Sequence, residues 1–160
     1  MPASKPNSPN PIQAQLKLKS ADPFGMFDAC WQVQKAWLKQ PQALSKKLFD
    51  LGSGLTSLQM QTACQLVGRN GCDLIPAVRY DERFQEPIWK ENPFFDHIKE
   101  VYLLSTHWLE DSIYETPDLE EHTRLKAGFQ TRQLLNAVAP SNFFWTNPAA
   151  LRRCLETGGY

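Results

Sequence analysis

The sequence predicts an all-α fold. Apolar residues recur at three- and four-residue steps through most of the chain, which is the spacing of an amphipathic helix. Proline follows a capping residue at three places, Asp22-Pro23, Asn92-Pro93 and Asn147-Pro148, and this order is typical of a helix start. No stretch combines alternating polarity with β-branched residues, so no strand is predicted. We expect an irregular multi-helix domain with a disordered tail and one extended, proline-rich connection.

Residues 1–21 are predicted to form a disordered tail, because they are rich in Pro, Ser, Asn and Gln and offer little apolar surface to bury. A first helix then starts at Asp22-Pro23 and ends before Pro41, with an apolar face that includes Phe27, Trp31 and Leu38. A chain of 160 residues corresponds to about one domain. Residues 22–160 are therefore expected to form a single helical domain.

A leucine seam predicts a long second helix. Its apolar positions follow the alternating four- and three-residue steps of a heptad pattern: Leu44, Leu48, Leu51, Leu55, Leu58 and Thr62, with Leu66 one position out of register. Gly52-Ser53-Gly54 weakens this helix, since each glycine costs about 1 kcal/mol relative to alanine, and a kink or local fraying is expected there. Asn70-Gly71 is predicted to close the helix.

Residues 76–93 are predicted to form the mostly extended connection, because they carry three prolines among alternating polar and aromatic residues. We expect Phe84 and Trp89 to pin this connection to the rest of the domain. Asp81 and Arg83 are expected to form an ion pair and a turn that hold it.

Three further helices complete the predicted domain. The third begins at Asn92-Pro93 and carries an apolar face of Phe94, Ile98, Val101, Leu104 (or Tyr102), Trp108 and Ile113. The fourth begins at Pro117-Asp118, ends before Pro140 and presents Leu119, Leu125, Phe129, Leu134, Leu135 and Val138. A short last helix begins at Asn147-Pro148 and ends at Gly158-Gly159.

Two stretches rich in proline and aromatic residues carry the most specific pattern. Residues 81–95 read Asp-Glu-Arg-Phe-Gln-Glu-Pro-Ile-Trp-Lys-Glu-Asn-Pro-Phe-Phe, and residues 140–148 read Pro-Ser-Asn-Phe-Phe-Trp-Thr-Asn-Pro. Together they resemble the N-terminal region of the class I poly(3-hydroxyalkanoate) (poly-beta-hydroxybutyrate) synthase family, in which the same motifs are separated by helices. The pattern gives twelve candidate docking or structural residues: Asp81, Arg83, Phe84, Trp89, Asn92, Pro93, Asn142, Phe143, Phe144, Trp145, Asn147 and Pro148.

The resemblance implies an acyltransferase whose full-length form moves 3-hydroxyacyl groups from coenzyme A thioesters onto a growing polyester. The family's cysteine nucleophile lies in a Gly-x-Cys-x-Gly box of an α/β-hydrolase-like domain. Here Gly71 precedes Cys72, but Leu74 stands where the second glycine belongs. The chain stops at residues 157–160, where the family continues into that domain. We therefore expect a truncated, excised or separately encoded N-terminal part with no catalytic residue and no cofactor, inactive alone.

The resemblance also implies partners: the synthase catalytic domain in cis or in trans, a second copy of the chain, and the cytoplasmic polyester granule surface or its phasins. Phe143, Phe144 and Trp145 are consecutive, so one helix face cannot bury all three and at least one ring points to another surface. Two interpretations of these rings stay open at this point. They either dock on the catalytic domain or anchor a loop in the chain's own core.

Two rival functions are also open. The second helix is similar in composition to granule-coating phasins, and its apolar stripe either lies on the polymer surface or packs on the other helices. The first rival is therefore a stand-alone, non-enzymatic granule-binding or regulatory protein. The second is a thiol enzyme that uses Cys72 or Cys154.

Composition argues against several classes of protein. The formal net charge is zero, without a Lys/Arg cluster, which argues against a nucleic-acid partner. No apolar run approaches eighteen residues and no signal-peptide pattern is present, so neither a membrane span nor secretion is predicted. The cysteines lack metal-ligand spacing, and so do His97, His107 and His122, so no metal site is predicted.

Overall fold

The computed structural model describes residue 22, residues 24–68 and residues 81–159. It contains six α-helices and two short 3₁₀ helices in this part of the chain, which confirms the all-α prediction, and no strand is found there. The predicted tail over residues 1–21, Asn70-Gly71, Cys72 and the first part of the predicted connection lie outside the described residues. The elements are α2 (Met26–Leu38), α3 (Pro41–Leu66), η1 (Glu82–Phe84), α4 (Ile88–Glu91), α5 (Pro93–Tyr114), α6 (Glu121–Ala137), η2 (Pro140–Asn142) and α7 (Pro148–Thr157).

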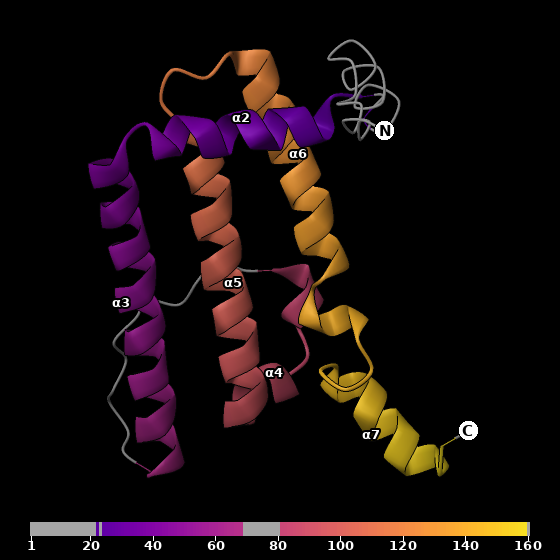
Figure 1. Ribbon diagram of the computed structural model, residues 1–160. Helices are drawn as coiled ribbons and strands as arrows, with labels where there is room; N and C mark the ends of the chain where they lie inside the picture. Colours follow the sequence, from indigo (N-terminus) through magenta and orange to yellow (C-terminus); the bar gives the residue numbers. More distant parts are fainter. Residues whose placement is uncertain (1–21, 23, 69–80, 160) are drawn as a thin grey trace, which may run out of the picture.

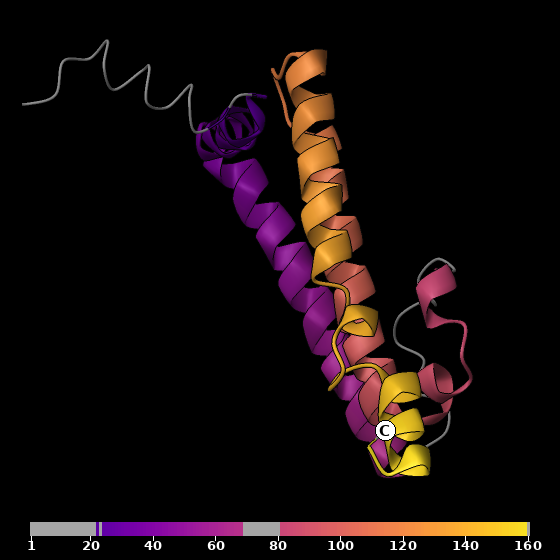
Figure 2. The same cartoon turned by 90° about the vertical axis from the view of Figure 1, so that its right-hand side faces the viewer.

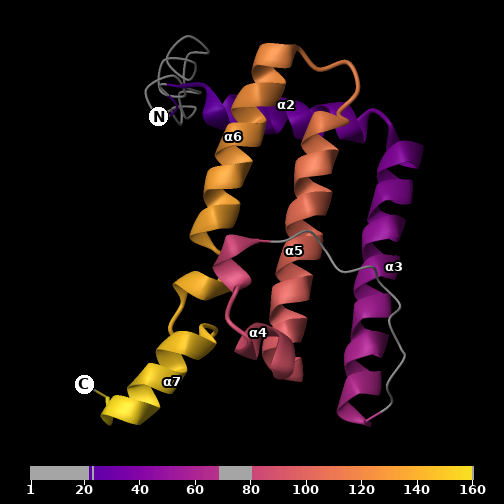
Figure 3. The same ribbon diagram turned by 180° about the vertical axis from the view of Figure 1, so that it is seen from behind.

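Three long helices, α3, α5 and α6, run alongside one another with α5 in the middle, and α2 crosses them at one end (Figure 1). In Figure 2 helix α2 is seen nearly end-on, on one face of the α5 and α6 pair. Seen from behind in Figure 3, α4 lies at the other end of α5, on the side where α7 and the C-terminus lie, and η1 lies beside the middle of α5. The two motif stretches therefore meet at the end of the molecule that α2 does not cover.

Helix α2 begins later than predicted and its N-cap residue is Gly25 rather than Asp22, although the Asp22 carboxylate still binds the first turn. It starts at Met26, after Gly25 in the left-handed conformation at φ 66°. The Asp22 carboxylate accepts hydrogen bonds from the backbone N–H groups of Met26 at 2.8 Å and of Asp28 at 3.0 Å. These bonds satisfy donors of the first helical turn that have no partner within the helix. The helix ends at Leu38, before Pro41, as predicted.

Helix α3 is continuous from Pro41 to Leu66, so the local fraying predicted at Gly52-Ser53-Gly54 is wrong, while the alternative of a kink there stays a prediction. A Cβ atom added at Gly54 would lie 3.2 Å from Cδ2 of Leu104 on α5, so this glycine sits where the two helices approach closely. The helix ends at Leu66 and Gly68 follows at φ 73°, so the predicted closure at Asn70-Gly71 is placed too late.

The connection described from Asp81 onward is helical rather than extended, which corrects that prediction. Residues Glu82–Phe84 form a 3₁₀ turn, and Ile88–Glu91 form a short α-helix. The prolines permit this because Pro87 precedes the helix, where no backbone N–H is required. Phe84 and Trp89 are both buried, as expected for residues that pin the segment.

The apolar face predicted for α6 is wrong. The helix begins at Glu121 rather than Pro117-Asp118, and its buried residues are the small side chains of Thr123, Ala127 and Gly128. Leu125, Phe129, Leu134 and Val138 are instead exposed. Small residues let α6 lie close to its neighbours: a Cβ added at Gly128 would lie 3.2 Å from the hydroxyl of Tyr114 on α5. The buried face of this helix is therefore made of small residues and not of its large apolar ones.

Helices α5 and α7 begin as predicted. Asn92 accepts a hydrogen bond from the backbone N–H of Phe94 at 3.0 Å, and Pro93 occupies the first helical position. Asn147 accepts from the N–H groups of Ala149 and Ala150, and Pro148 follows it. On α5, however, Phe94 is exposed, whereas Tyr102, Leu103 and Ile113 are buried.

Candidate docking site

Arg83 joins three separate parts of the chain. Its guanidinium contacts the Asp81 carboxylate at 2.6 Å, between Nη2 and Oδ2, and the backbone N–H of Arg83 donates to Asp81 Oδ1 at 2.9 Å. The predicted ion pair and turn therefore form. Arg83 Nη1 also donates to the Tyr102 hydroxyl on α5 at 2.9 Å and to Asn136 Oδ1 on α6 at 3.1 Å. The Tyr102 hydroxyl in turn donates to the Leu135 carbonyl at 2.9 Å.

The charges of this pair stabilise each other. The side-chain hydrogen bond from Arg83 holds the pKa of Asp81 below its usual range, and the same bond raises the pKa of the Arg83 guanidinium. Both groups are consequently ionised at neutral pH. The partners Tyr102 and Asn136 were not among the candidate residues, because long-range hydrogen bonds leave no periodic signal in the sequence.

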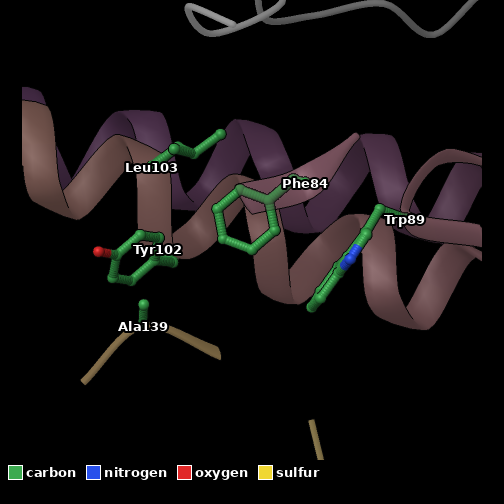
Figure 4. Packing of buried hydrophobic residues seen from close by; sticks show 5 residues of the cluster. All are labelled: Phe84, Trp89, Tyr102, Leu103 and Ala139. Carbon is green, nitrogen blue, oxygen red and sulfur yellow. The ribbon is translucent and has the colours of Figure 1, made fainter. Parts of the chain in front are cut away.

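An aromatic cluster lies beside this ion pair. Figure 4 shows the Phe84 ring between Tyr102 and Trp89, with Ala139 next to Tyr102. The rings of Phe84 and Trp89 meet edge-to-face at a centroid distance of 4.8 Å. The centroids of Phe84 and Tyr102 lie 5.8 Å apart, with the two rings tilted. Aromatic pairs in such arrangements gain about 0.5–1.5 kcal/mol beyond the area that they bury. The cluster joins η1, α4 and α5 to the end of α6.

A buried lysine closes the cluster on its α4 side. Lys99 is 7% exposed, and its ammonium donates to Asp96 at 2.7 Å and lies 3.1 Å from Glu100. Burial works against this charge, but the hydrogen bonds to Asp96 and Glu100 raise the pKa of Lys99. The ammonium also lies 3.4 Å from the Trp89 carbonyl, so it ties α5 to α4.

The second motif, residues 140–148, forms a loop braced by its own polar side chains. Asn142 Nδ2 donates to the Asn136 carbonyl at 2.6 Å, and Asn147 Nδ2 donates to the Ser141 carbonyl at 2.7 Å. The Thr146 hydroxyl donates to the Pro140 carbonyl at 2.7 Å. Pro148 at the end of the loop is fully buried. The backbone between these residues is thus fixed by side-chain hydrogen bonds.

The braced loop turns its aromatic residues outward. Phe143 and Phe144 are exposed, and Trp145 is 78% exposed. The rings of Phe144 and Trp145 contact each other edge-to-face at 5.0 Å. The expectation that at least one of the three rings points away from the core is met by all three. We refer to Phe143, Phe144 and Trp145 below as the aromatic triplet.

The described cysteines and His97 lie on helices α2, α3, α5 and α7. Cys154 on α7 is half-buried. On α2, burial raises the pKa of the Cys30 thiol and so disfavours the reactive thiolate of that residue. His97 contacts Thr62 at 2.9 Å and Gln59 at 3.2 Å, so it links α5 to α3. The described part of the chain contains no group of three His, Cys, Asp or Glu that could hold a metal ion. Within that part, no helix has the length and apolar character needed to cross a membrane.

A family model described as poly-beta-hydroxybutyrate polymerase (PhaC) N-terminus matches residues 80–160. The chain belongs to this family. The match begins just before η1 and runs through α7, so it contains the ion pair, the aromatic cluster and the aromatic triplet of this PhaC N-terminal region. Helices α2 and α3 precede it. The resemblance stated from the two motifs is confirmed.

Curated relatives of the PhaC N-terminal region are much longer. A poly(3-hydroxyalkanoate) polymerase of Methylorubrum extorquens is 39% identical over 128 residues, which cover 80% of this chain and 21% of that protein. The poly(3-hydroxyalkanoate) polymerase subunit PhaC of Rhizobium etli is 32% identical over 153 residues, covering 92% of this chain and 24% of that protein. The chain thus spans a quarter or less of the length of either relative. No solved structure matches it.

Proposed function

We propose that this chain is the non-catalytic N-terminal region of a poly(3-hydroxyalkanoate) polymerase and that it docks on the catalytic part of that enzyme through the aromatic triplet. The family match and the polymerase names of the relatives support the parent activity. The absence of a Gly-x-Cys-x-Gly box from the sequence supports a role without chemistry of its own. The chain then works in the cytoplasm, wherever the polymerase acts on its granule.

The exposure of the aromatic triplet on a braced loop is the observation that carries this proposal. Exposed large aromatic residues cost hydration free energy unless another surface covers them, and aromatic side chains are enriched at interfaces. The hydrogen bonds of Asn142, Thr146 and Asn147 hold the loop before any partner arrives. Preorganisation of this kind reduces the entropy lost on binding.

Co-expression with a separate polymerase catalytic domain tests the docking. We expect the two chains to co-purify, and we expect coenzyme A release from 3-hydroxybutyryl-CoA to rise when both are present. Trp145→Asp places a charge in the docking surface and should abolish co-purification. Phe49→Asp is the matched control, because Phe49 is equally exposed but lies on α3. Failure to co-purify, or a complex that tolerates Trp145→Asp, would contradict the proposal.

Attachment to the granule surface, or to its phasins, is a second candidate function, which one observation on α3 favours. Phe49 and Met60 are exposed and lie eleven residues apart, so they share one side of α3, and the exposed Val67 follows at the C-cap of the helix. An exposed apolar line of this kind can lie on an apolar surface. Binding to purified polyester granules distinguishes the two functions. Phe49→Asp should weaken granule binding if α3 makes the contact, while leaving the catalytic domain bound.

A further inference from the structure

The last turn of α6 is bound by side chains from other parts of the chain. The final carbonyl groups of an α-helix have no partner within the helix. In α6 the Leu135 carbonyl accepts from the Tyr102 hydroxyl at 2.9 Å, and the Asn136 carbonyl accepts from Asn142 Nδ2 at 2.6 Å. Asn142 Nδ2 also lies 3.4 Å from the Ala137 carbonyl. The end of α6 is thus tied to α5 and to the loop that carries the aromatic triplet.

Asn136 is the residue of this turn at which the two motifs meet. Its side-chain Oδ1 accepts from Arg83 Nη1 of the first motif at 3.1 Å, and its main-chain carbonyl accepts from Asn142 of the second motif. Arg83 is held in turn by Asp81 and by the Tyr102 hydroxyl. Its positive charge lies beside the C-terminal end of α6 (Figure 3), where the helix dipole favours a cation. A continuous path of hydrogen bonds therefore runs from the ion pair to the loop.

We propose that Asn136 is a positioning residue for docking, which transmits the fixed position of Arg83 to the loop of the aromatic triplet. The inference rests on the proposed docking function and deepens it, since Asn136 acts through the loop and not by contact with the catalytic domain. Asn136 is exposed, so its side chain contributes little to the core. Its bond to Arg83 instead holds the last turn of α6, and with it the carbonyl that binds Asn142.

Loss of the bond between Arg83 and Asn136 should loosen the loop without unfolding the helix. The last turn of α6 then frays, and the carbonyl that accepts from Asn142 moves. The aromatic triplet samples several orientations, so docking must pay the entropy of ordering the loop that the bound turn otherwise removes in advance. The position of the triplet therefore depends on an ion pair in a different motif.

Hydrogen exchange of the full chain measures the order of the loop without any partner. The backbone amides of Thr146 and Asn147 both donate to the Phe143 carbonyl, so their exchange reports on the loop. Asn136→Ala removes the acceptor for Arg83 and leaves the main-chain carbonyl in place. We expect exchange at the two amides to become about fivefold faster, the change that corresponds to the roughly 1 kcal/mol of an ordinary hydrogen bond. Amides in the middle of α5 should exchange as in the wild type.

Docking of the full chain on a separate polymerase catalytic domain gives the second measurement. Asn136→Ala should raise the Kd of docking about fivefold. Asn136→Asp keeps an oxygen acceptor opposite Arg83 and should dock with nearly the wild-type Kd. Gln133→Ala is the matched control, because Gln133 is also exposed and lies one turn earlier on α6, and it should leave both the exchange and the Kd unchanged.

A double-mutant cycle tests whether Arg83 acts on the loop through the turn of α6. Arg83→Lys removes the planar fork that reaches Asp81 and Asn136 together, and Asn142→Ala removes the bond from the loop to α6. Each change alone should raise the Kd of docking. Because both act along one path, the double variant should dock about as well as the weaker-binding single variant, whereas independent effects would multiply.

Three outcomes would overturn the inference. The first is an Asn136→Ala chain whose loop exchange and Kd of docking both match the wild type. The second is an equal loss in Gln133→Ala or in Asn136→Asp, which would mean that the acceptor for Arg83 is not responsible. The third is a double variant whose effects multiply. A wild-type chain that does not dock would contradict the proposed function instead, and exchange of the chain alone would still decide whether Asn136 fixes the loop.

Discussion

At the scale of single residues, two aromatic side chains that are close in sequence differ in burial. Trp89 on α4 is 2% exposed inside the aromatic cluster, whereas Phe94, at the start of α5, is 62% exposed. We predict that Trp89→Ala lowers the free energy of unfolding by about 3–5 kcal/mol, because it removes the ring and leaves a cavity. Phe94→Ala should change it by about 0.5 kcal/mol or less. Urea denaturation followed by circular dichroism measures both, and equal midpoints for the two variants would contradict the assignment.

The ion pair between Asp81 and Arg83 makes stability depend on pH. The pKa of Asp81 is lowered in the folded chain by its hydrogen bond from Arg83. The stabilisation is therefore fully present above the unfolded carboxyl pKa of about 4 and is lost as pH falls through the lower, folded pKa. Asp81→Asn should reduce stability by on the order of 1 kcal/mol at pH 7, since the pair is partly exposed.

The difference in stability between the wild type and Asp81→Asn should shrink as the pH falls below about 4. The wild-type carboxylate is then protonated and, like the amide of the variant, carries no charge. Urea midpoints of both proteins between pH 7 and pH 2 give the measurement. Glu82→Gln, at the exposed neighbouring carboxylate, is the control and should leave the pH profile unchanged. A constant difference between wild type and Asp81→Asn at all pH values would show that the charge of Asp81 is not responsible.

At the scale of elements, two glycines of α3 allow the effect of helix propensity on stability to be measured apart from the effect of packing. Gly52 has no atom within 4 Å of an added Cβ, whereas a Cβ at Gly54 would meet Leu104 at 3.2 Å. Both lie inside a continuous helix. We predict that Gly52→Ala raises the free energy of unfolding by about 1 kcal/mol, the propensity difference. Gly54→Ala should raise the free energy of unfolding by a smaller amount, because the Leu104 side chain must shift. Equal gains in thermal or urea unfolding would show that α3 and α5 do not approach closely there.

The starts of α5 and α7 could be predicted, because capping is local, whereas α2 and α6 begin later than predicted. Asn92-Pro93 and Asn147-Pro148 specify their helices within three residues of sequence. The buried face of α6 could not be predicted from apolar periodicity. Its position depends on how closely Ala127 and Gly128 let the helix approach α2 and α5, and that is a property of the packed molecule.

The candidate site was predictable in composition but not in arrangement. The two motifs identified Asp81, Arg83, Phe84 and Trp89, and the consecutive aromatic residues indicated an exposed ring. Sequence spacing contained no information that Arg83 would reach Tyr102 on α5 and Asn136 on α6. The prolines of the segment around Trp89 favour an extended chain in the sequence, but Pro87 and Pro93 stand where a helical turn tolerates them.

At the scale of the whole molecule, the described residues leave much of their apolar surface uncovered. Ten hydrophobic residues are buried, whereas twenty large hydrophobic residues are exposed. The exposed ones lie on every long helix except the middle of α5, and they include the aromatic triplet and Phe27, Trp31 and Leu38 of α2. Single exposed apolar residues are ordinary, whereas clusters of them are typical of surfaces that a partner covers. This exposure supports the proposed docking of the chain on the catalytic part of a polymerase.

This surface makes a prediction about the isolated chain. We expect it to bind the hydrophobic dye ANS while it is fully folded, with a cooperative urea transition that a molten globule would lack. Dye fluorescence should fall when the polymerase catalytic domain is added, because that domain covers the aromatic triplet. It should also fall in the variant Trp145→Asp, because the substitution places a charge in the triplet. A native chain that binds no dye would mean that the exposed residues contact one another instead, and the proposed docking surface would then lose its physical basis.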